Sequence, residues 1–367
     1  MKTSKLISAG ALLAAAALTL VGCSGEAAPQ ASGDGSGYRV ALSMSYTGND
    51  WQATSRNLIT AAAEMDPLKD KVAGVDVFVS GDEAQNQISQ LQQMIAQKYD
   101  AIIVYPISPT ALNQTIKMAC DSGIKVFAYD ATVTEPCAYN VTYDQAEYAT
   151  KSAEHLSKLM GNKGNVVMIT GVAGTSTDED RNAAAIKTFE KNGIKVLDQC
   201  AGDWAQGPSG ECMSRFLAAF DNIDGVWSQA GGVSLTAAFD AANRPYVPIL
   251  SEGENAWRLA LADPAYAAKG LVGASVGSPQ YQGVAALHLA VDALEGKDVE
   301  HNVNVGFGWV TQDEVKVCET GSLAELEAGC NAFAQDLVSP GFFADWFSEK
   351  WTPGMDLSIA LSGKAAK

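Results

Sequence analysis

Short apolar runs alternate with helix-length amphipathic segments along the chain from residue 39 onward. Four runs, rich in β-branched and aromatic residues, have the length of buried strands and cover 39–45, 72–79, 101–105 and 125–130. Between them, apolar residues recur at helical spacing, which predicts helices over 52–65 and 85–97 and a third that ends near Cys120. This succession of βα units predicts a parallel sheet with right-handed crossovers.

The same alternation resumes after residue 143. It predicts helices and strands over 144–160, 165–170, 178–191, 195–199, 210–220, 226–228, 234–242, 247–250, 270–276 and 279–294. Beyond residue 299 the pattern weakens, and 337–367 contains several aromatic residues without a clear period, so we assign no element there. About 330 residues follow the N-terminal segment. This is more than one hydrophobic core usually serves, so we expect two domains.

One predicted strand, 125–130, ends in an acidic residue, Asp130. In open α/β sheets, ligands bind in the crevice beyond the carboxyl ends of the strands. Asp130 is therefore expected at the rim of such a crevice, where one half of the protein meets the other. An aspartate in this position can also serve only as a turn or helix-cap residue, and the local sequence leaves both interpretations open.

The first 22 residues have the organisation of a secretory signal peptide. Two lysines precede an apolar run, 6–21, that no acidic residue interrupts and that is short for a membrane span. The run leads into Leu20-Val21-Gly22-Cys23, which resembles the lipobox of bacterial lipoproteins and implies cleavage before Cys23 and diacylation of its thiol. An ordinary signal peptide with a chance cysteine is the alternative. Residues 23–37, rich in Gly, Ser, Ala and Pro, are expected to form a flexible tether.

The chain is strongly acidic, with 42 Asp and Glu against 25 Lys and Arg and a formal net charge of −17. Loss of the signal peptide would remove Lys2 and Lys5 and bring the charge to −19. Such a chain is not expected to bind nucleic acid or to dock electrostatically on anionic lipid. Attachment to the membrane would therefore depend on the lipid at Cys23.

Six cysteines besides Cys23 stand in pairs that are close in sequence. An even number in an exported protein favours disulfides. The expected local bonds join Cys120 to Cys137, Cys200 to Cys212, and Cys318 to Cys330, although six cysteines allow about fifteen connectivities. Metal binding is the competing use, but no Cys-x-x-Cys occurs and the three histidines are scattered, so we expect neither a metal site nor a cofactor.

Three short motifs occur in order along the chain. Val40-Ala41-Leu42 is followed by Asn49, a helix over 85–94 leads to 100–104, and the glycine-containing run 171–176 is followed by Arg181. In their order and spacing they resemble the type I periplasmic sugar-binding proteins, the ribose- and galactose-binding group of ABC transporter receptors. The autoinducer-2 receptor has the same fold. The resemblance covers about 38–308, most of the mature chain.

This resemblance implies a particular α/β fold, the periplasmic binding protein-like I arrangement. Two doubly wound parallel-sheet lobes would be joined by a three-strand hinge and would close over one solute. The implied N-terminal lobe consists of 38–141 plus about 276–306. The implied C-terminal lobe consists of 142–275 plus about 307–367.

The resemblance also implies which residues bind the solute. By position they are Asn49, Trp51, Asp130, Arg181, Trp204, Gln229 and Glu252. Gln229 stands where ribose-type receptors have an asparagine, and Glu252, expected just after the strand 247–250, replaces the usual aspartate. Two further departures leave the identity of the solute open: Ala131 replaces an arginine beside the acid, and 276–278 replaces a glutamine.

These residue types suit a polyol, which offers many hydroxyls and apolar C–H faces. Asp130 and Glu252 would accept hydrogen bonds from neighbouring hydroxyls, while the guanidinium of Arg181 would donate to others. Trp51 and Trp204 would cover the C–H faces as rigid walls. A surface ion pair is the alternative for Arg181, and a place in the core is the alternative for either tryptophan.

Enzyme motifs give little support to catalysis. The run 171–176 lacks the Gly-Lys-Ser/Thr ending of a phosphate loop, and no Gly-x-Gly-x-x-Gly follows the first strand. The sequence therefore predicts a monomeric, lipid-anchored receptor on the extracytoplasmic face of the cell membrane, which binds a sugar or polyol and delivers it to an ABC permease. The alternatives are a sensor lipoprotein, for example for autoinducer-2, that signals to a membrane kinase, and an exported enzyme.

Overall fold

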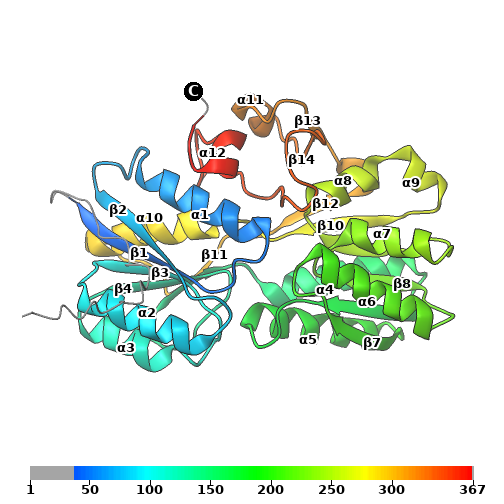
Figure 1. The fold of residues 1–367 in the computed structure, drawn as a ribbon, viewed down its shortest axis with the longest axis horizontal. Coiled ribbons are helices and arrows are strands. Elements are labelled where there is room, and N and C mark those ends of the chain that lie inside the picture. Colours follow the sequence, from blue (N-terminus) through cyan, green and yellow to red (C-terminus); the bar gives the residue numbers. More distant parts are fainter. Residues whose placement is uncertain (1–36, 366–367) are drawn as a thin grey trace, which may run out of the picture.

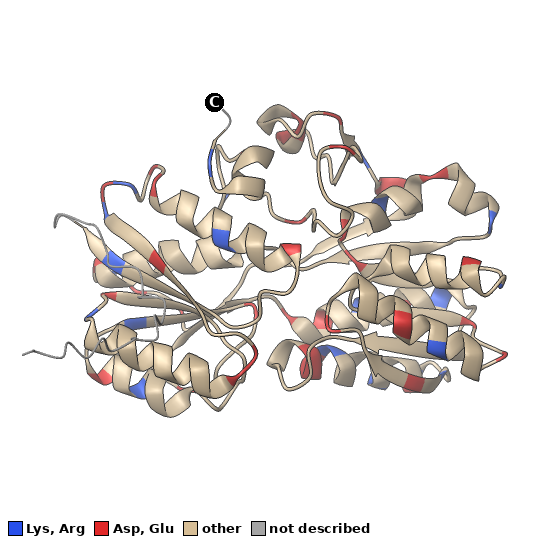
Figure 2. Cartoon of the chain, in the orientation of Figure 1, with Lys and Arg blue, Asp and Glu red and all other residues tan. Residues whose placement is uncertain are grey.

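The computed structural model describes residues 37–365, which form two lobes side by side (Figure 1). The expected signal peptide, Cys23 and nearly all of the tether lie outside the described residues. Acidic and basic residues are interspersed over the elements of both lobes (Figure 2). In the described part of the chain, no helix combines the length and the apolar character needed to cross a bilayer.

The first lobe is built on a six-stranded sheet in the order β11-β5-β4-β3-β1-β2, in which all neighbours are parallel. Its strands are β1 (Tyr38–Met44), β2 (Val72–Val79), β3 (Ala101–Tyr105), β4 (Lys125–Tyr129), β5 (Tyr139–Thr142) and β11 (Asn302–Asn304). Helices α1 (Asp50–Ala63) and α10 (Gln282–Leu294) pack on one face, and α2 (Ala84–Ala96) and α3 (Asn113–Asp121) on the other. The inner strands are buried on both faces, which is why they are almost continuously apolar in sequence.

The second lobe repeats this plan with the order β12-β10-β9-β8-β6-β7, parallel except for the edge strand β12. Its strands are β6 (Asn165–Thr170), β7 (Lys195–Ala201), β8 (Gly225–Ser228), β9 (Ile249–Glu252), β10 (Gly273–Gly277) and β12 (Gly308–Thr311). One face carries α4 (Gln145–Leu159) and α5 (Ser176–Lys191), and the other carries α6 (Gln206–Ala219), α7 (Gly232–Ala241) and α8 (Asn255–Ala262), which α9 (Pro264–Ala268) follows. Both sheets are therefore covered on both faces, as predicted for two doubly wound α/β lobes.

The chain passes between the lobes at three places, from β5 to α4, from β10 to α10, and from β11 to β12. These passages form the three-strand hinge that the family resemblance implies. The exact limits of the lobes, 38–141 plus about 276–306 and 142–275 plus about 307–367, stay a prediction because they concern which residues move together.

Residues 312–365 form short elements along the upper side of both lobes in Figure 1. These are η1 (Gln312–Glu314), β13 (Val317–Cys318), α11 (Leu323–Glu327), β14 (Ala332–Phe333) and α12 (Leu357–Ser362). Their apolar side chains, Phe333 and Trp346 among them, join the core cluster that contains α1 of the first lobe. The backbone of the same segment bonds to α8 of the second lobe, where Asn255 N donates to Phe342 O at 2.6 Å. The segment therefore contacts both lobes.

The structure pairs the six cysteines of the described chain locally, as expected. Cys120 in α3 is bonded to Cys137, which precedes β5. The other two bonds are Cys200–Cys212, between β7 and α6, and Cys318–Cys330, within the C-terminal segment. Of the fifteen or so possible connectivities, the chain thus adopts the one in which each bond closes a short loop.

Some predicted element boundaries were wrong. The strand expected over 247–250 is β9, Ile249–Glu252, because Pro248 has no N–H to give to the ladder. Glu252 is therefore the last residue of the strand rather than a residue after it. The helix expected from 210 begins at Gln206, since a proline at its third position is tolerated in a first turn.

Candidate functional site

A cavity of about 260 Å³ lies between the lobes, where the carboxyl ends of their strands meet. Its lining consists of Asn49, Trp51, Gln52, Tyr105 and Asp130 from the first lobe, Thr177, Arg181, Trp204 and Glu252 from the second, and Ser278 and Phe343. The structure thus brings together every predicted site residue except Gln229.

Asp130 directly follows β4, in a left-handed backbone conformation with φ of 62°. Thr142 Oγ1 donates to its carbonyl oxygen at 2.7 Å, which fixes the turn. Its carboxylate Oδ1 accepts hydrogen bonds from Gln282 Nε2 at 2.9 Å and Ser278 Oγ at 3.2 Å. Burial raises the pKa of Asp130, against the lowering effects of Arg181 and these two hydrogen bonds. No described residue donates to Oδ2.

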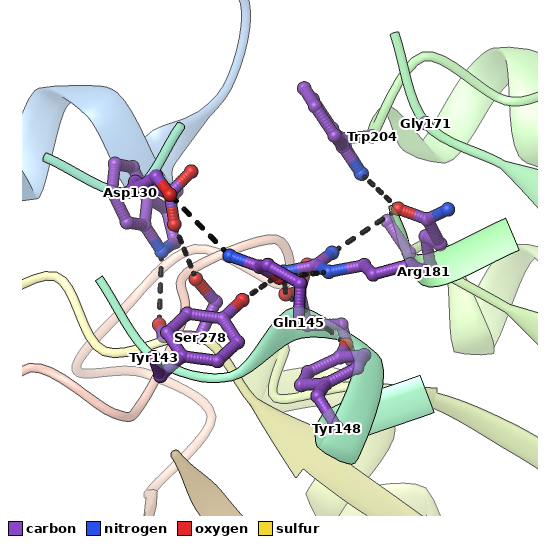
Figure 3. Close-up of polar contacts among 12 residues, drawn as sticks. Asp130, Tyr143, Gln145, Tyr148, Gly171, Arg181, Trp204 and Ser278 are labelled. Carbon is purple, nitrogen blue, oxygen red and sulfur yellow. Dashed lines mark hydrogen bonds and ion pairs between the residues drawn. The ribbon is translucent and has the colours of Figure 1, made fainter. Parts of the chain in front are cut away.

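Arg181, on α5, lies across the cavity from Asp130 (Figure 3) and is buried. Its Nε donates to Gln145 Oε1 at 2.8 Å and its Nη1 to Gln229 Oε1 at 3.2 Å. Its Nη2 donates to Tyr143 OH and, at 3.2 Å, to Glu252 Oε1. Because a guanidinium has five N–H groups, one N–H of Nη1 is left without a partner among the described residues. Burial alone would lower the pKa of Arg181, but Tyr143 and other nearby ionisable groups raise it well above its usual value.

Glu252 completes a buried charge cluster with Arg181. Its Oε1 also accepts from Tyr148 OH at 3.3 Å, and the guanidinium carbon of Arg181 lies 4.2 Å from the ring centre of Tyr148. Burial raises the pKa of Glu252 to about 7, although Arg181 lowers it.

Trp204 forms an aromatic wall of the second lobe, in the turn between β7 and α6. Asp203 and Trp204 both have left-handed backbone conformations, with φ of 52° and 51°. The indole Nε1 donates to Gln229 Oε1 at 2.9 Å. A Cβ on Gly171 would lie 2.2 Å from the indole ring, so a glycine is needed at that position. The run 171–176 thus begins with a residue that makes room for the wall.

Trp51 forms the corresponding wall of the first lobe, at the start of α1. Its Nε1 donates to Ser278 O at 2.9 Å. Its ring is stacked with that of Tyr129 at a centroid distance of 6.4 Å, and the ring of Tyr105 lies 5.9 Å away. Trp51 is therefore part of the aromatic core of the lobe and of the cavity wall at once.

Asn49 links the two lobes beside the cavity. Its Oδ1 caps α1 by accepting from two backbone N–H groups at 3.0 and 3.4 Å, and its Nδ2 donates to Trp204 O at 3.0 Å. Tyr46 OH donates to the neighbouring carbonyl oxygen, Asp203 O, at 3.1 Å. These contacts between lobes show that the structure is in a closed arrangement.

Gln229 lies behind the cavity wall. Its Oε1 accepts from both Arg181 and Trp204, and its Nε2 donates to Asp178 Oδ1 and Asn182 Oδ1 at 2.9 Å each. In this position Gln229 orients two residues of the lining. Direct contact between Gln229 and a solute stays a prediction.

Sequence reasoning missed several residues of the lining, which are Gln52, Tyr105, Thr177, Ser278 and Phe343. Tyr105 ends the third strand, so the rule that placed Asp130 at the rim could have placed Tyr105 as well. Gln52 immediately follows the predicted site residue Trp51 after the first strand, so its position could also have indicated a place in the lining. Phe343 lies in the segment without a period, and no pattern indicated it.

Two of the missed residues of the lining contain buried polar atoms that lack a hydrogen-bond partner. Gln52 Oε1 and Thr177 Oγ1 have no hydrogen-bond partner among the described residues, although both side chains are almost fully buried. Buried polar atoms are hydrogen-bonded in the great majority of cases. Ten other buried side-chain atoms of the described chain also lack a partner, so it is the position of Gln52 and Thr177 in the cavity lining that makes them candidate ligand contacts.

Neither a metal centre nor a hydrolase elbow is found at the site. Within residues 37–365, no group of three His, Cys, Asp or Glu side chains is placed to hold a metal ion. The run Gly273–Gly277 has the Gly-x-Ser-x-Gly spacing of a nucleophile elbow, but it forms the strand β10. Its Ser275 is buried, and Ser275 Oγ accepts from Arg258 Nε at 3.0 Å, so it is not an exposed nucleophile on a turn.

Comparison with known proteins identifies relatives of most of the chain. A model of the family described as periplasmic binding protein domain matches residues 40–298. The xylitol-binding protein of Mycolicibacterium smegmatis is 27% identical over 248 residues, which are 65% of this chain and 68% of the relative. The ribose import binding protein of Bacillus subtilis is 22% identical over 298 residues, which are 80% of this chain and 95% of the relative.

Solved structures share the fold. An ABC transporter solute-binding protein from Thermobispora bispora superposes with a TM-score of 0.72 at 23% identity, covering 90% of this chain and 98% of that one. A periplasmic solute-binding protein from Actinobacillus succinogenes, solved with bound D-allose, has a TM-score of 0.65 at 20% identity and covers 76% of this chain and 98% of that one.

Proposed function

The chain belongs to the periplasmic binding protein domain family, and from this premise we propose that it is the solute receptor of an ABC importer. It encloses one small sugar or polyol between its lobes and delivers it to a membrane permease. The names of the xylitol- and ribose-binding relatives support this class of solute. The sensor alternative is not favoured, since the ribose relative is named for import.

The observation that carries this proposal is the set of unsatisfied polar atoms around the cavity. Within residues 37–365, Gln52 Oε1 and Thr177 Oγ1 have no hydrogen-bond partner, and neither do Asp130 Oδ2 and one N–H of Arg181. A molecule with several hydroxyls can donate to the three oxygens and accept from the guanidinium. A solute without them would leave these buried groups unpaired, at a cost of about 1–3 kcal/mol each.

The walls suit the other part of such a molecule. Trp51 and Trp204 border the cavity from opposite lobes, and their indole N–H groups are already bonded to Ser278 and Gln229. Their rings therefore offer apolar contact to the C–H faces of a sugar or polyol. We propose that the solute is bound and released unchanged, in keeping with relatives that are binding proteins.

Members of this family act outside the cytoplasm, and the N-terminal residues supply the proposed location. We propose that Cys23 carries a lipid and that 23–37 tethers a monomeric receptor to the outer face of the membrane. Two acyl chains hold a protein firmly, whereas one binds reversibly. A Cys23→Ala variant should lose metabolic lipid labelling and be released or left unprocessed. Unchanged labelling of that variant would contradict the proposal.

Calorimetry over pentoses, hexoses, linear polyols and autoinducer-2 tests the function directly. At least one sugar or polyol should bind the purified protein and raise its thermal unfolding midpoint. A solute at about 100 times its Kd stabilises the folded state by about 2.7 kcal/mol. Absence of binding by every sugar and polyol would reject the proposed solute class, and chemical change of a bound solute would reject the receptor role.

A further inference from the structure

The C-terminal segment reaches the cavity although it lies beyond residues 40–298, the part of the chain that matches the family. Within it, residues 339–346 run from the first lobe to the second, and we refer to them as the strap. At one end, Ser339 Oγ donates to the Asp50 carboxylate at the start of α1. At the other, Ala344 N donates to Gly253 O at 2.9 Å, and Phe343 forms a β-bridge with Glu254. The upper part of Figure 1 shows this segment over both lobes.

The strap is anchored in the hinge by Asp345. Arg258 Nη2 donates to its carboxylate, and Arg258 Nη1 holds the same segment by donating to Asn331 O at 2.7 Å. A Cβ on Gly277 would lie 2.1 Å from a carboxylate oxygen of Asp345, and one on Gly308 would lie 2.3 Å away. Gly277 and Gly308 end β10 and begin β12, at two of the three passages between the lobes. The carboxylate therefore fills the space that these hinge glycines leave.

Phe343, two residues before this anchor, is part of the cavity lining. Gln280 Nε2 donates to its carbonyl oxygen at 2.9 Å, and its side chain is only 2% exposed. Unlike most of the lining, its side chain offers neither a donor nor an acceptor. The part of a solute next to Phe343 must therefore present C–H groups, because a hydroxyl there would lose its hydrogen bonds to water.

We propose that Phe343 determines the specificity of the solute site by limiting how long a solute fits the cavity, and that Asp345 positions it. This inference rests on the proposed function, since it names the residue that selects among sugars and polyols at the same site. The strap places a buried apolar side chain in the cavity lining, and the contacts of Asp345 hold it there. Compact solutes with a C–H face next to Phe343 are accepted, and solutes that extend a further hydroxymethyl group toward it are excluded.

Affinities for linear polyols of four, five and six carbons and for the matching sugars test this inference. The decisive quantity is the ratio of the affinities for the longer and the shorter solute. Phe343→Ala should move this ratio at least about tenfold toward the longer solutes, which corresponds to about 1.4 kcal/mol. Phe343→Leu should move this ratio in the same direction by a smaller factor. If the alanine variant does not fold, the leucine variant provides the test.

Phe347→Ala is the matched control, because Phe347 lies in the same segment, packs edge-on against Trp346 and does not line the cavity. It should leave the ratio unchanged even where it lowers stability. Asp345→Asn keeps the size of the side chain and removes its charge, so it should loosen the strap and move the ratio in the same direction as Phe343→Ala. A purely structural role of Asp345 would lower all affinities and leave the ratio unchanged.

The outcomes separate the two proposals. If the wild-type protein binds none of the sugars and polyols, the proposed function is rejected, and the inference with it. If the wild type binds and both Phe343 variants keep its ratio, the inference alone is overturned. A ratio that shifts equally in Phe347→Ala would also overturn it, because the effect would then belong to the segment as a whole.

Discussion

Three of the six non-glycine residues with a positive φ in the described chain lie in or beside the cleft. Asp130, Asp203 and Trp204 have φ between 51° and 62°, a region in which a bulky residue such as tryptophan is rare. Such conformations cost on the order of 1–3 kcal/mol each and persist only where the surroundings impose them. Here they turn Asp130 and Trp204 toward the cavity, one from each lobe. The strain therefore serves to aim side chains that a regular strand end would direct elsewhere.

Replacement of Gly171 tests whether the position of the Trp204 ring depends on the space that this glycine leaves. A Gly171→Ala side chain would lie 2.2 Å from the indole ring, so the ring must shift. We expect an overpacking cost of about 1–3 kcal/mol and a loss of solute affinity of about tenfold or more by calorimetry. Gly207→Ala is the control, because a Cβ there meets nothing within 4 Å. Equal affinities of the two variants would contradict this role of Gly171.

Replacement of Asp130 should affect binding far more than folding. Asp130→Ala removes a charged acceptor from the cavity, at a cost of about 2–5 kcal/mol of binding free energy, so affinity should fall by at least about thirtyfold. Its partners Ser278 and Gln282 lose only one acceptor each. The exposed Asp298→Ala should bind as the wild type does. Wild-type affinity of Asp130→Ala would show that the cavity is lined differently from the proposal.

Arg181 should behave differently, because it holds the site together. Its removal leaves the buried Gln145 Oε1 without a donor. It also removes one of the two donors to Gln229 Oε1 and the cationic partner of the buried Glu252. Breaking a buried ion pair from one side typically costs about 3–5 kcal/mol of stability. We therefore expect Arg181→Ala to lose affinity by at least about thirtyfold and, in contrast to Asp130→Ala, to unfold at a clearly lower temperature. If Arg181→Ala unfolds at the same temperature as the wild type, Arg181 does not stabilise the folded site in this way.

At the scale of elements, helix α7 has an unusual start. Its N-cap residue is Gly231, with φ of 84° and no side chain to cap the helix. Instead, Glu254 Oε2 accepts from Gly231 N at 2.6 Å and from Gly232 N at 3.2 Å. Burial raises the pKa of Glu254 to about 8, although the Gly231 N–H lowers it. A buried carboxyl group with a raised pKa thus caps this helix from another element.

This cap makes stability depend on pH in a defined direction. Between pH 4.5 and about 8, folded Glu254 keeps a proton that the unfolded chain has lost, so stability falls as pH rises. Glu252, with a pKa of about 7, adds to the same trend. We expect the unfolding midpoint to fall by on the order of 10 °C from pH 5 to pH 8. Glu254→Gln, which resembles the protonated acid, should show a smaller fall, whereas the exposed Glu190→Gln should match the wild type. If the unfolding midpoint falls equally in all three proteins, the pH dependence does not come from Glu254.

Local sequence pattern was informative where an element is regular and buried on known faces. The strands β1, β3 and β4 were predicted within a few residues because buried parallel strands are nearly all apolar. Asp130 followed from the rule for strand ends. The strap could not be predicted, since its two neighbouring strands, β13 and β14, have two residues each and depend on tertiary contacts. Phe343 therefore appears in the lining without any signal in the sequence.

At the scale of the whole molecule, the cavity exists only because the two lobes meet. Asp130 and Arg181 lie on different lobes, and the bonds from Asn49 to Trp204 and from Tyr46 to Asp203 join the lobes beside the cavity. A solute that contacts both lobes stabilises this closed arrangement by its differential affinity for it. Solute binding and lobe closure are therefore thermodynamically coupled. A permease that binds the closed form in preference to the open form would thereby distinguish the loaded protein from the empty one.

Small-angle scattering, together with binding measurements, can separate two contributions to closure: the contacts that the solute makes with the lobes, and the direct hydrogen bonds between the lobes. Saturating solute should reduce the radius of gyration of the wild type, and Asp130→Ala should fail to contract at the same solute concentration. Tyr46→Phe removes only the hydroxyl that donates to Asp203 O at 3.1 Å, outside the cavity lining. A hydrogen bond contributes about 1 kcal/mol net, so this variant should bind every solute about fivefold more weakly while keeping the order of preference and still contracting at saturation. If the radius of gyration of the wild type is unchanged at saturation, binding does not draw the lobes together. If Tyr46→Phe changes the order in which solutes are preferred, closure and selectivity are not separable in this protein.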